Sequence, residues 1–256
     1  EKDAPDHVLV LAGDHIYKMD YAEMFRFHKE RNADATVAAI ETPRRSAGAF
    51  GIMEVDEESQ VLDFEEKPSN PACIPGRPDL AFASMGIYLF NTRTLLEYLK
   101  SDALRDTAHD FGKNIIPQMM KTSRVVAYNF KDENKKEAKY WRDVGTIDAY
   151  WEANMDVVSV DPQLNLYDRA WPIRTYQAQN PPAKFVFAQE KKGGRLGIAL
   201  DSIVAHGCII SGGSVKRSIL SPKVTVHSFS EIEDSILLEG VDVGRNAKIK
   251  RTIIDK

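Results

Sequence analysis

The sequence predicts an α/β domain followed by a parallel β-helix, and three observations support this fold class. Near the amino terminus, an aliphatic run is followed by an acidic residue and then by a helix signal. Further along the chain, apolar strands alternate with amphipathic helices up to about residue 160. Beyond residue 200, an apolar residue recurs about every six positions, which is typical of hexapeptide β-helix repeats.

The first of these observations describes a strand, a loop and a helix. Residues 8–11 are all aliphatic, which favours a strand covered on both faces, as in a parallel sheet. Asp14 follows that strand and Gly13, where open α/β sheets bind ligands. Asp20 and Glu23 match a capping box at the start of a helix. We therefore predict that Asp14 lies in a functional site; the alternative is that its carboxylate only caps a turn.

Further strands follow from apolar runs. Alternating polar and apolar residues indicate that the runs at residues 50–55 and 61–66 form an antiparallel pair with one polar face. Ser84 is the conspicuous polar side chain of the run at residues 81–90. Lys67 precedes Pro68, and proline disfavours helical backbone in the residue before it, so we expect Lys67 to be extended where its strand ends. The runs occupy residues 35–41, 50–55, 61–66 and 81–90.

The remainder of the α/β domain contains another strand and three helices. The strand is predicted at residues 124–130, and the charged segment 131–139 that follows it is predicted to be a solvated loop. Thr146 is a good N-cap for the last helix, which we expect to extend to Met155. Asp143 is therefore a second carboxylate placed directly before a helix. The other two helices are predicted at residues 92–100 and 111–121.

The repeat region has its own rhythm, and it follows a proline-containing stretch without periodicity. We expect an α/β domain at residues 1–160, a linker at 161–199 and a β-helix at 200–256. The sequence does not begin with Met and its last repeat has no polar cap, so we expect a piece of a longer protein. The repeating apolar residues are Ile203, Ile209, Val215, Leu220, Val226, Ile232, Leu238, Val243, Ile249 and Ile254.

Composition narrows the classes of function. The net charge of −4 argues against nucleic acid as a partner, because nucleic-acid binding needs a clustered basic surface. Two cysteines are too few for a disulfide framework, which fits a cytoplasmic protein. No apolar run in the sequence approaches the roughly 20 residues that span a bilayer, so no membrane association is expected.

Five motifs, in this order, resemble those of the bacterial glucose-1-phosphate adenylyltransferase family, also called ADP-glucose pyrophosphorylases. Each motif alone is a weak signal, but all five followed by hexapeptide repeats are a specific combination, and the resemblance covers essentially the whole chain. The motifs are LAGDHIY at residues 11–17, FEEKP at 64–68, ASMGIY at 83–88, YWRDVGT at 140–146 and YDRAWPIR at 167–174.

The resemblance implies a Rossmann-like nucleotidyltransferase sheet, present here in part, and a left-handed β-helix. It implies that ATP and glucose 1-phosphate react to ADP-glucose and pyrophosphate in glycogen synthesis. By resemblance, Asp14 and Asp143 hold the catalytic Mg²⁺ and Lys67 binds the sugar phosphate. The resemblance also implies that Glu66 and Ser84 contact the glucose or its phosphate and that Gly51 approaches this ligand through its backbone. A homotetramer and an allosteric small-molecule effector are also implied.

The residue types suit this chemistry independently of the resemblance. The sugar phosphate is itself the nucleophile, so the protein needs to align the reactants and neutralise charge. Carboxylates are the ligands that Mg²⁺ prefers, and a lysine supplies a positive charge for a phosphate. Each assignment has an alternative: Lys67 as a solvated charge, Ser84 as a satisfied strand hydroxyl, and Asp143 as a helix cap or as the partner of Arg142.

Other readings of the chain remain open. The family's glycine-rich ATP loop is absent from this sequence, so we expect this chain by itself to bind sugar phosphate weakly at most. A UTP- or dTTP-dependent sugar nucleotidyltransferase shares several of the motifs, and a non-catalytic regulatory paralogue that assembles through its β-helix is a third hypothesis. The triplet DFG at residues 110–112 matches a kinase metal-binding triplet, but no other kinase pattern accompanies it, so we interpret it as coincidence.

Overall fold

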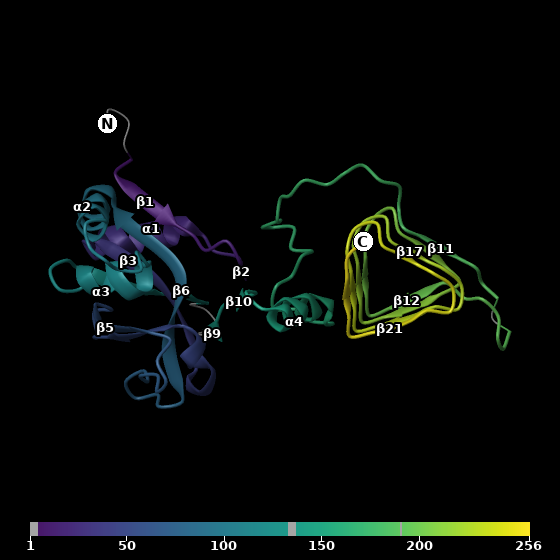
Figure 1. Cartoon of the computed structure of the whole chain (residues 1–256), viewed down its shortest axis with the longest axis horizontal. Coiled ribbons are helices and arrows are strands. Elements are labelled where there is room, and N and C mark those ends of the chain that lie inside the picture. The colour runs from purple at the N-terminus through teal and green to yellow at the C-terminus, as the bar shows by residue number, and fades with distance from the viewer. Residues whose placement is uncertain (1–4, 133–136, 190) are drawn as a thin grey trace. The chain divides into compact units, whose positions relative to one another are not determined.

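The computed structural model describes residues 5–132, 137–189 and 191–256 (Figure 1). Within them the chain divides into two compact units. Unit 1 comprises residues up to 13 together with residues 18–139, and unit 2 comprises residues 14–17 together with residues 140–256. None of the described helices has both the length and the apolar character needed to cross a membrane.

Unit 1 is built on a mixed sheet whose longest strand is β6 (Leu80–Asn91). Strand β3 (Ala35–Pro43) lies antiparallel to β6 along one edge and parallel to β7 (Val125–Asn129) on its other side. The opposite edge of β6 pairs antiparallel with β4 (Gly51–Val55), which continues to β5 (Val61–Glu66). The three apolar runs at residues 35–41, 81–90 and 124–130 are thus confirmed as strands of one sheet.

The first strand, β1 (His7–Val10), is present but does not have the predicted pairing. It lies antiparallel to the end of β6, with Val8 opposite Phe90, and its residues are only half-buried. The prediction of a strand covered on both faces of a parallel sheet was therefore wrong. Aliphatic residues indicate burial, but the direction of pairing depends on a partner about eighty residues away, which local sequence does not encode.

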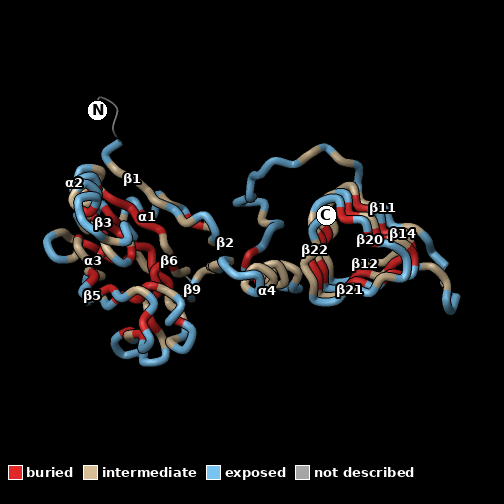
Figure 2. The backbone as a smooth tube through the Cα atoms, viewed as in Figure 1, coloured by how far each residue is buried: buried red, intermediate tan, exposed pale blue. Residues whose placement is uncertain are grey.

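Helices cover both faces of the sheet. Alternate residues of β3 point to opposite faces. Ala35, Val37 and Ala39 belong to the core beneath α2 (Thr92–Asp102) and α3 (Ile116–Met119). Thr36 faces α1 (Tyr21–Glu30) instead, where its hydroxyl lies 2.8 Å from His28 Nδ1. Figure 2 shows the buried residues running along β3 and β6. Strands β3 and β6 therefore form the middle layer of three.

Local signals placed two helix starts correctly. Asp20 caps α1 by accepting from the Ala22 amide, and Thr146 caps α4 (Ile147–Val158) by accepting from the Ala149 amide. Glu23 does not complete the capping box as expected, because its carboxylate lies near the hydroxyl of Tyr128.

Two predictions near residues 111–139 need correction. The predicted helix at 111–121 begins as a π-helix, η2 (Phe111–Ile115), before the short α3. The predicted loop at 131–139 contains the paired strands β8 (Lys131–Asp132) and β9 (Glu137–Ala138), while residues 133–136 lie outside the described part.

Unit 2 contains a small antiparallel sheet of β2 (His15–Tyr17) and β10 (Trp141–Asp143), the helix α4, and a solenoid. The solenoid consists of three stacks of short parallel strands, which are β11-β14-β17-β20, β12-β15-β18-β21 and β13-β16-β19-β22. From β12 onward, successive strands of a stack lie 16 or 17 residues apart, as in Ala199, Val215 and Ile232, so one coil takes about that many residues. Strand β11 pairs with β14 across a longer interval, with Lys184 opposite Ile209. This arrangement confirms the predicted β-helix.

The solenoid strands span short segments. Their bounds are β11 (Lys184–Val186), β12 (Ile198–Leu200), β13 (Ile203–Val204), β14 (Ile209–Ser211), β15 (Ser214–Lys216), β16 (Ile219–Leu220), β17 (Thr225–Val226), β18 (Glu231–Glu233), β19 (Ile236–Leu237), β20 (Asp242–Val243), β21 (Lys248–Lys250) and β22 (Ile253–Ile254).

The interior of the solenoid corrects the predicted register at three positions. Val204, Ile210 and Leu237 belong to the core, in place of their neighbours Ile203, Ile209 and Leu238. Ile203 and Val204, like Ile209 and Ile210, are adjacent residues of one strand, and successive strand residues point to opposite faces, so one of each pair must point outward. Ile209 is accordingly 41% exposed, whereas Ile210 is fully buried. Leu238 instead follows the end of strand β19.

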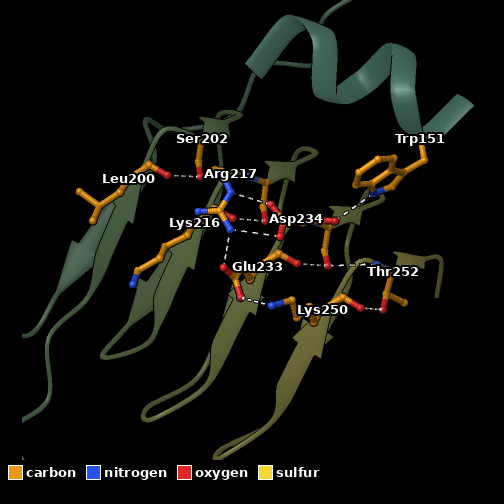
Figure 3. Close-up of polar contacts among 11 residues, drawn as sticks. Trp151, Leu200, Ser202, Lys216, Arg217, Glu233, Asp234, Lys250 and Thr252 are labelled. Atoms are coloured by element: carbon orange, nitrogen blue, oxygen red, sulfur yellow. Dashed lines mark hydrogen bonds and ion pairs between the residues drawn. The ribbon is translucent and has the colours of Figure 1, made fainter. Parts of the chain in front are cut away.

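One corner of the solenoid is held by a ladder of hydroxyl groups, which we call the hydroxyl ladder: Ser202, Ser218, Ser235 and Thr252 (Figure 3). Each rung repeats the same contact, because the hydroxyl oxygen of one coil accepts the backbone N–H of the next, at 3.0–3.1 Å. Each hydroxyl also donates to the carbonyl two residues before it, as Ser218 does to Lys216 at 2.6 Å. The ladder therefore gives hydrogen-bond acceptors to the amides of Ser218, Ser235 and Thr252, whereas carbonyls such as that of Lys216 also accept a backbone amide of the next coil.

Helix α4 contacts the same corner. The Trp151 indole N–H donates to the backbone carbonyl of Asp234 at 2.9 Å (Figure 3). The Arg251 guanidinium lies over the Trp151 ring, 4.9 Å from its centroid. Arg217 forms ion pairs with Glu233 and Asp234 beside it. These contacts fix α4 on the outer surface of the solenoid within unit 2.

We expect Ser218→Ala to destabilise the solenoid by about 1–3 kcal/mol, because the buried Ser235 amide loses its acceptor. Hydrogen exchange of the Ser235 amide, together with thermal unfolding, measures this effect. The matched control is Ser214→Ala on the adjacent strand, since that hydroxyl takes no part in the hydroxyl ladder. Equal protection of the Ser235 amide in wild type and Ser218→Ala would contradict the role of the ladder.

Candidate functional site

The predicted site residues fall into two groups, which the structure places in different units. Asp14 and Asp143 belong to unit 2, and Gly51, Glu66, Lys67 and Ser84 belong to unit 1. We call Asp14 and Asp143 the carboxylate pair, and we call Gly51, Glu66, Lys67 and Ser84 the Glu66 cluster.

The carboxylate pair is brought together by the small sheet of unit 2. Asp143 lies opposite His15 in the β2–β10 pairing, and the Asp14 carbonyl accepts the Val144 amide at 3.0 Å. One ligand atom from each of Asp14, His15 and Asp143 lies within 4.8 Å of the others. Strand pairing thus brings together two carboxylates that are far apart in the sequence.

The surroundings of the carboxylate pair fit a small, hard cation. A Cβ at Gly145 would lie 3.0 Å from Asp143 Oδ1 and 3.4 Å from Asp14 Oδ2, so glycine keeps the space beside both carboxylates open. The side chain of Asp14 is 61% exposed, which leaves room for the waters that Mg²⁺ retains. Carboxylate oxygens are the ligands that Mg²⁺ prefers, whereas an imidazole such as that of His15 suits softer metals.

The alternatives for Asp143 do not match the contacts. Asp143 Oδ1 accepts the Gly145 amide at 2.8 Å, while Thr146 caps the helix. Arg142 pairs with Asp156 on α4, with its Nε 2.9 Å from Asp156 Oδ2. Tyr140 donates to the same oxygen at 3.0 Å, and burial together with that carboxylate raises the pKa of Tyr140 to about 12. Strand β10 is therefore braced on α4 through Arg142 and Asp156, and not through Asp143.

The Glu66 cluster centres on a half-buried carboxylate between two glycines. Gly51 lies opposite Glu66 in the β4–β5 pair, and a Cβ on it would lie 2.6 Å from the Phe64 ring and 2.8 Å from Glu66 Oε2. A Cβ at Gly112 would also lie 2.8 Å from Glu66 Oε2. Both positions must be glycine for the carboxylate to lie there, so the backbone approaches it closely from two elements.

Lys67 differs from its prediction. Its φ is +52°, in the left-handed region, and its amide donates to the Phe50 carbonyl at 3.0 Å. The expectation of extended backbone was wrong, because the residue before a proline avoids the right-handed helical region but can still adopt the left-handed one when the chain must turn. The hydrogen bond from the Lys67 amide to the Phe50 carbonyl extends the pairing of β4 and β5 by one residue, and the pairing ends at this turn. Lys67 is exposed, so the functional role and the solvated charge both stay predictions at this position.

Ser84 lies on β6 at the edge of the same cluster. Its side chain is buried, and its hydroxyl accepts the Gly86 amide at 3.3 Å. The Tyr88 hydroxyl hydrogen-bonds to Ser84, and burial raises the pKa of Tyr88. Ser84 is thus partly satisfied within the strand, which keeps the strand-hydroxyl alternative open.

Sequence reasoning missed Asp110 and Tyr88 as neighbours of this cluster. Burial raises the pKa of Glu66 first, and the negative charge of Asp110 raises it further. Asp110 also caps η2 by accepting the Lys113 amide, and Phe111 stacks on Tyr88 with ring centroids 5.5 Å apart. The triplet at residues 110–112, which we interpreted as coincidence, therefore contributes a wall of the cluster. A π-helix turn is itself a frequent marker of functional sites, but it has no sequence signal.

Comparison with models of known protein families identifies the family to which the chain belongs. Residues 1–160 match the model of the family described as nucleotidyl transferase, and residues 181–256 match that of the GlmU-like C-terminal hexapeptide. The chain belongs to the nucleotidyl transferase family.

Three relatives, each named glucose-1-phosphate adenylyltransferase, are more than half identical to the chain over their aligned residues. The chain is 57% identical over 256 residues to a glucose-1-phosphate adenylyltransferase from Dechloromonas aromatica, covering 98% of this chain and 58% of that protein. It is 54% identical over 257 residues to one from Rhodopirellula baltica, covering all of this chain and 58% of that protein. Another, from Paramagnetospirillum magneticum, is 54% identical over 258 residues, covering 98% of this chain and 59% of that protein. The chain thus spans less than two thirds of these relatives.

The raised pKa of Glu66 makes the stability of the folded protein depend on pH. Because the folded-state pKa lies above the usual value of 4.5, the folded protein binds this proton more tightly than the unfolded chain. The contribution of Glu66 to stability is therefore favourable below the unfolded-state pKa and is lost as pH rises through the folded-state pKa. We expect Glu66→Gln, which has no charge to bury, to melt at a higher temperature than wild type at pH 7, with the difference shrinking towards pH 4.

Thermal unfolding at both pH values measures this difference. The control is Glu65→Gln, at the exposed neighbouring position on β5. A melting difference between Glu66→Gln and wild type that stays constant with pH would contradict the raised pKa.

We expect Asp143→Asn to weaken Mn²⁺ binding by about tenfold or more, since even residues that only support metal ligands are worth that much. Mn²⁺ is the probe because its electron paramagnetic resonance signal reports the free ion directly. The control is Asp148→Asn, which removes an exposed carboxylate from the first turn of α4. Equal Mn²⁺ affinity in wild type and Asp143→Asn would exclude the carboxylate pair as the metal site.

Proposed function

We propose that the full-length protein is a glucose-1-phosphate adenylyltransferase that makes ADP-glucose and pyrophosphate from ATP and glucose 1-phosphate. The observation that carries the proposal is the 54–57% identity to relatives of that name, over nearly the whole chain. The proposal extends to ADP-glucose supply for glycogen synthesis, in the cytoplasm.

The Glu66 cluster is proposed to bind glucose 1-phosphate. Lys67 would place its ammonium on the sugar phosphate, where a charge-assisted hydrogen bond both anchors and neutralises it. Glu66 would accept hydrogen bonds from glucose hydroxyls, and its partial burial strengthens such bonds. Gly51 would let the sugar approach the backbone, and Ser84 would offer its hydroxyl to the same ligand.

The carboxylate pair is proposed to hold Mg²⁺ through Asp14 and Asp143. When bound, the ion would neutralise negative charge on the phosphates as the α-phosphorus of ATP is attacked. The nucleophile is the phosphate oxygen of glucose 1-phosphate, and pyrophosphate leaves with the electrons of the broken bond. The residues of this chain therefore act by aligning the substrates and compensating charge, without a covalent intermediate.

The solenoid is proposed to serve assembly and regulation. Its stacked strands carry charged residues on the outer surface, including the network of Arg217, Glu233, Asp234 and Lys250. We propose a homotetramer that responds to a small-molecule effector, as the resemblance implies.

The full-length protein is expected to release pyrophosphate from ATP only when glucose 1-phosphate and Mg²⁺ are present. Lys67→Gln is expected to raise KM for glucose 1-phosphate roughly 10- to 100-fold, because a hydrogen bond to a charged group is worth about 1.5–3 kcal/mol. KM for ATP should stay within about twofold if Lys67 binds only the sugar phosphate. Steady-state pyrophosphate release with each substrate varied in turn measures both constants.

Lys100→Gln, on the exposed end of α2, is the matched control for a lost surface charge. A preference for UTP over ATP would replace the proposed reaction with that of a related sugar nucleotidyltransferase. No product from any nucleotide, with the carboxylate pair intact, would point to a non-catalytic subunit.

A further inference from the structure

A buried carboxylate outside the Glu66 cluster is the starting point. Among the residues that the structure describes, Asp102 is the one Asp or Glu residue that is buried, with 3% of its surface exposed. It is the last residue of α2. Its Oδ1 accepts the Thr107 hydroxyl at 3.0 Å, and its Oδ2 lies 2.7 Å from His109 Nδ1. A buried charge needs such partners, so the carboxylate is committed to the loop that follows the helix.

His109 lies in that loop with an unfavourable backbone. Its φ is +53°, a conformation that side chains other than glycine adopt rarely, although Asn, Asp and His tolerate it better than most. The His109 amide donates to Thr107 Oγ1 at 3.2 Å, and the imidazole holds the Asp102 carboxylate. The hydrogen bond to His109 lowers the pKa of Asp102. The side chain of His109 is 56% exposed, so its role is not core packing.

The next residue begins the wall of the Glu66 cluster. The Asp110 amide donates to Asn114 Oδ1 at 3.1 Å, and the Asp110 carbonyl accepts the amides of Asn114 and Ile115. Asp110 and Gly112 are the residues of this wall that act on Glu66, one through charge and one through close approach. The direction in which the chain leaves His109 therefore decides where that wall lies.

We propose that the Asp102–His109 pair is a positioning device that holds the 110–112 wall against Glu66 and so sets the affinity for glucose 1-phosphate. The inference deepens the proposed function and rests on it. Asp102 and His109 act through Asp110 and Gly112 and do not touch the substrate. Thr107 supports the pair by occupying the second carboxylate oxygen.

Three substitutions at His109 in the full-length protein separate the side-chain bond from the backbone conformation. His109→Asn keeps both a donor for Asp102 and tolerance of positive φ. His109→Gly keeps the backbone freedom without the donor, and His109→Ala keeps neither. We expect KM for glucose 1-phosphate to rise about tenfold in the Ala and Gly variants and to remain near wild type in the Asn variant. The kcat and the KM for ATP should stay within about twofold throughout.

The control is Asp106→Asn, which removes an exposed charge from the same loop. A wild-type KM for glucose 1-phosphate in His109→Gly would overturn the proposal, since backbone freedom alone would then suffice. Equal loss of kcat, both KM values and thermal stability in His109→Ala would also overturn it, because the pair would then be merely structural.

A readout that does not depend on activity separates this inference from the proposed function. Hydrogen exchange of the amides of Lys113, Asn114 and Ile115 should speed up in His109→Ala, while exchange within α2 stays as in wild type. If wild type makes no ADP-glucose but this change appears, the proposed function fails and the positioning contact stands. If exchange is unaltered while wild type is active, the positioning device is refuted and the proposed function stands.

Discussion

Unit 1 depends on the backbone pairing of β6. A buried strand must find partners for its amides and carbonyls along both edges, and β6 does so with β3 on one edge and with β4 and β1 on the other. The second edge is not continuous: β4 reaches Phe82 and Ala83, and β1 begins at Tyr88. The register with β3 also shifts over this stretch. Between these limits β6 has an irregular segment with Gly86 at φ +65°.

This irregular segment of β6 explains the place of the Glu66 cluster. Ser84 lies at its start and satisfies the Gly86 amide locally, while Tyr88 lies at its end. Where strand pairing lapses, backbone and polar side chains become available to a ligand, and interruptions of this kind are common beside active sites. The same strand that organises the core thus also places Ser84 and Tyr88 near Glu66.

The features that could be predicted from the sequence are those fixed by residues close together in the chain. Asp20 and Thr146 were predicted as caps because capping depends on residues within one helical turn, and the long strands because burial requires apolar runs. The pairing direction of β1, the conformation of Lys67 and the role of Asp110 depend on partners elsewhere in the chain. The DFG triplet at residues 110–112 has the right residues for a wall beside Glu66, but nothing near it in sequence indicates the strand it faces. In the solenoid, adjacent aliphatic residues such as Ile209 and Ile210 fix the period without fixing which of them points inward.

The position of the carboxylate pair likewise depends on contacts between segments that are far apart in the sequence. Asp14 and Asp143 are joined by the β2–β10 pairing, β10 is braced by Tyr140 and Arg142 on Asp156 of α4, and α4 is fixed to the solenoid corner by Trp151. Each contact is ordinary, yet together they form a continuous path of hydrogen bonds and packed elements from Asp143 to the hydroxyl ladder. The corner of the solenoid therefore contributes, through α4, to the position of Asp143, a proposed metal ligand.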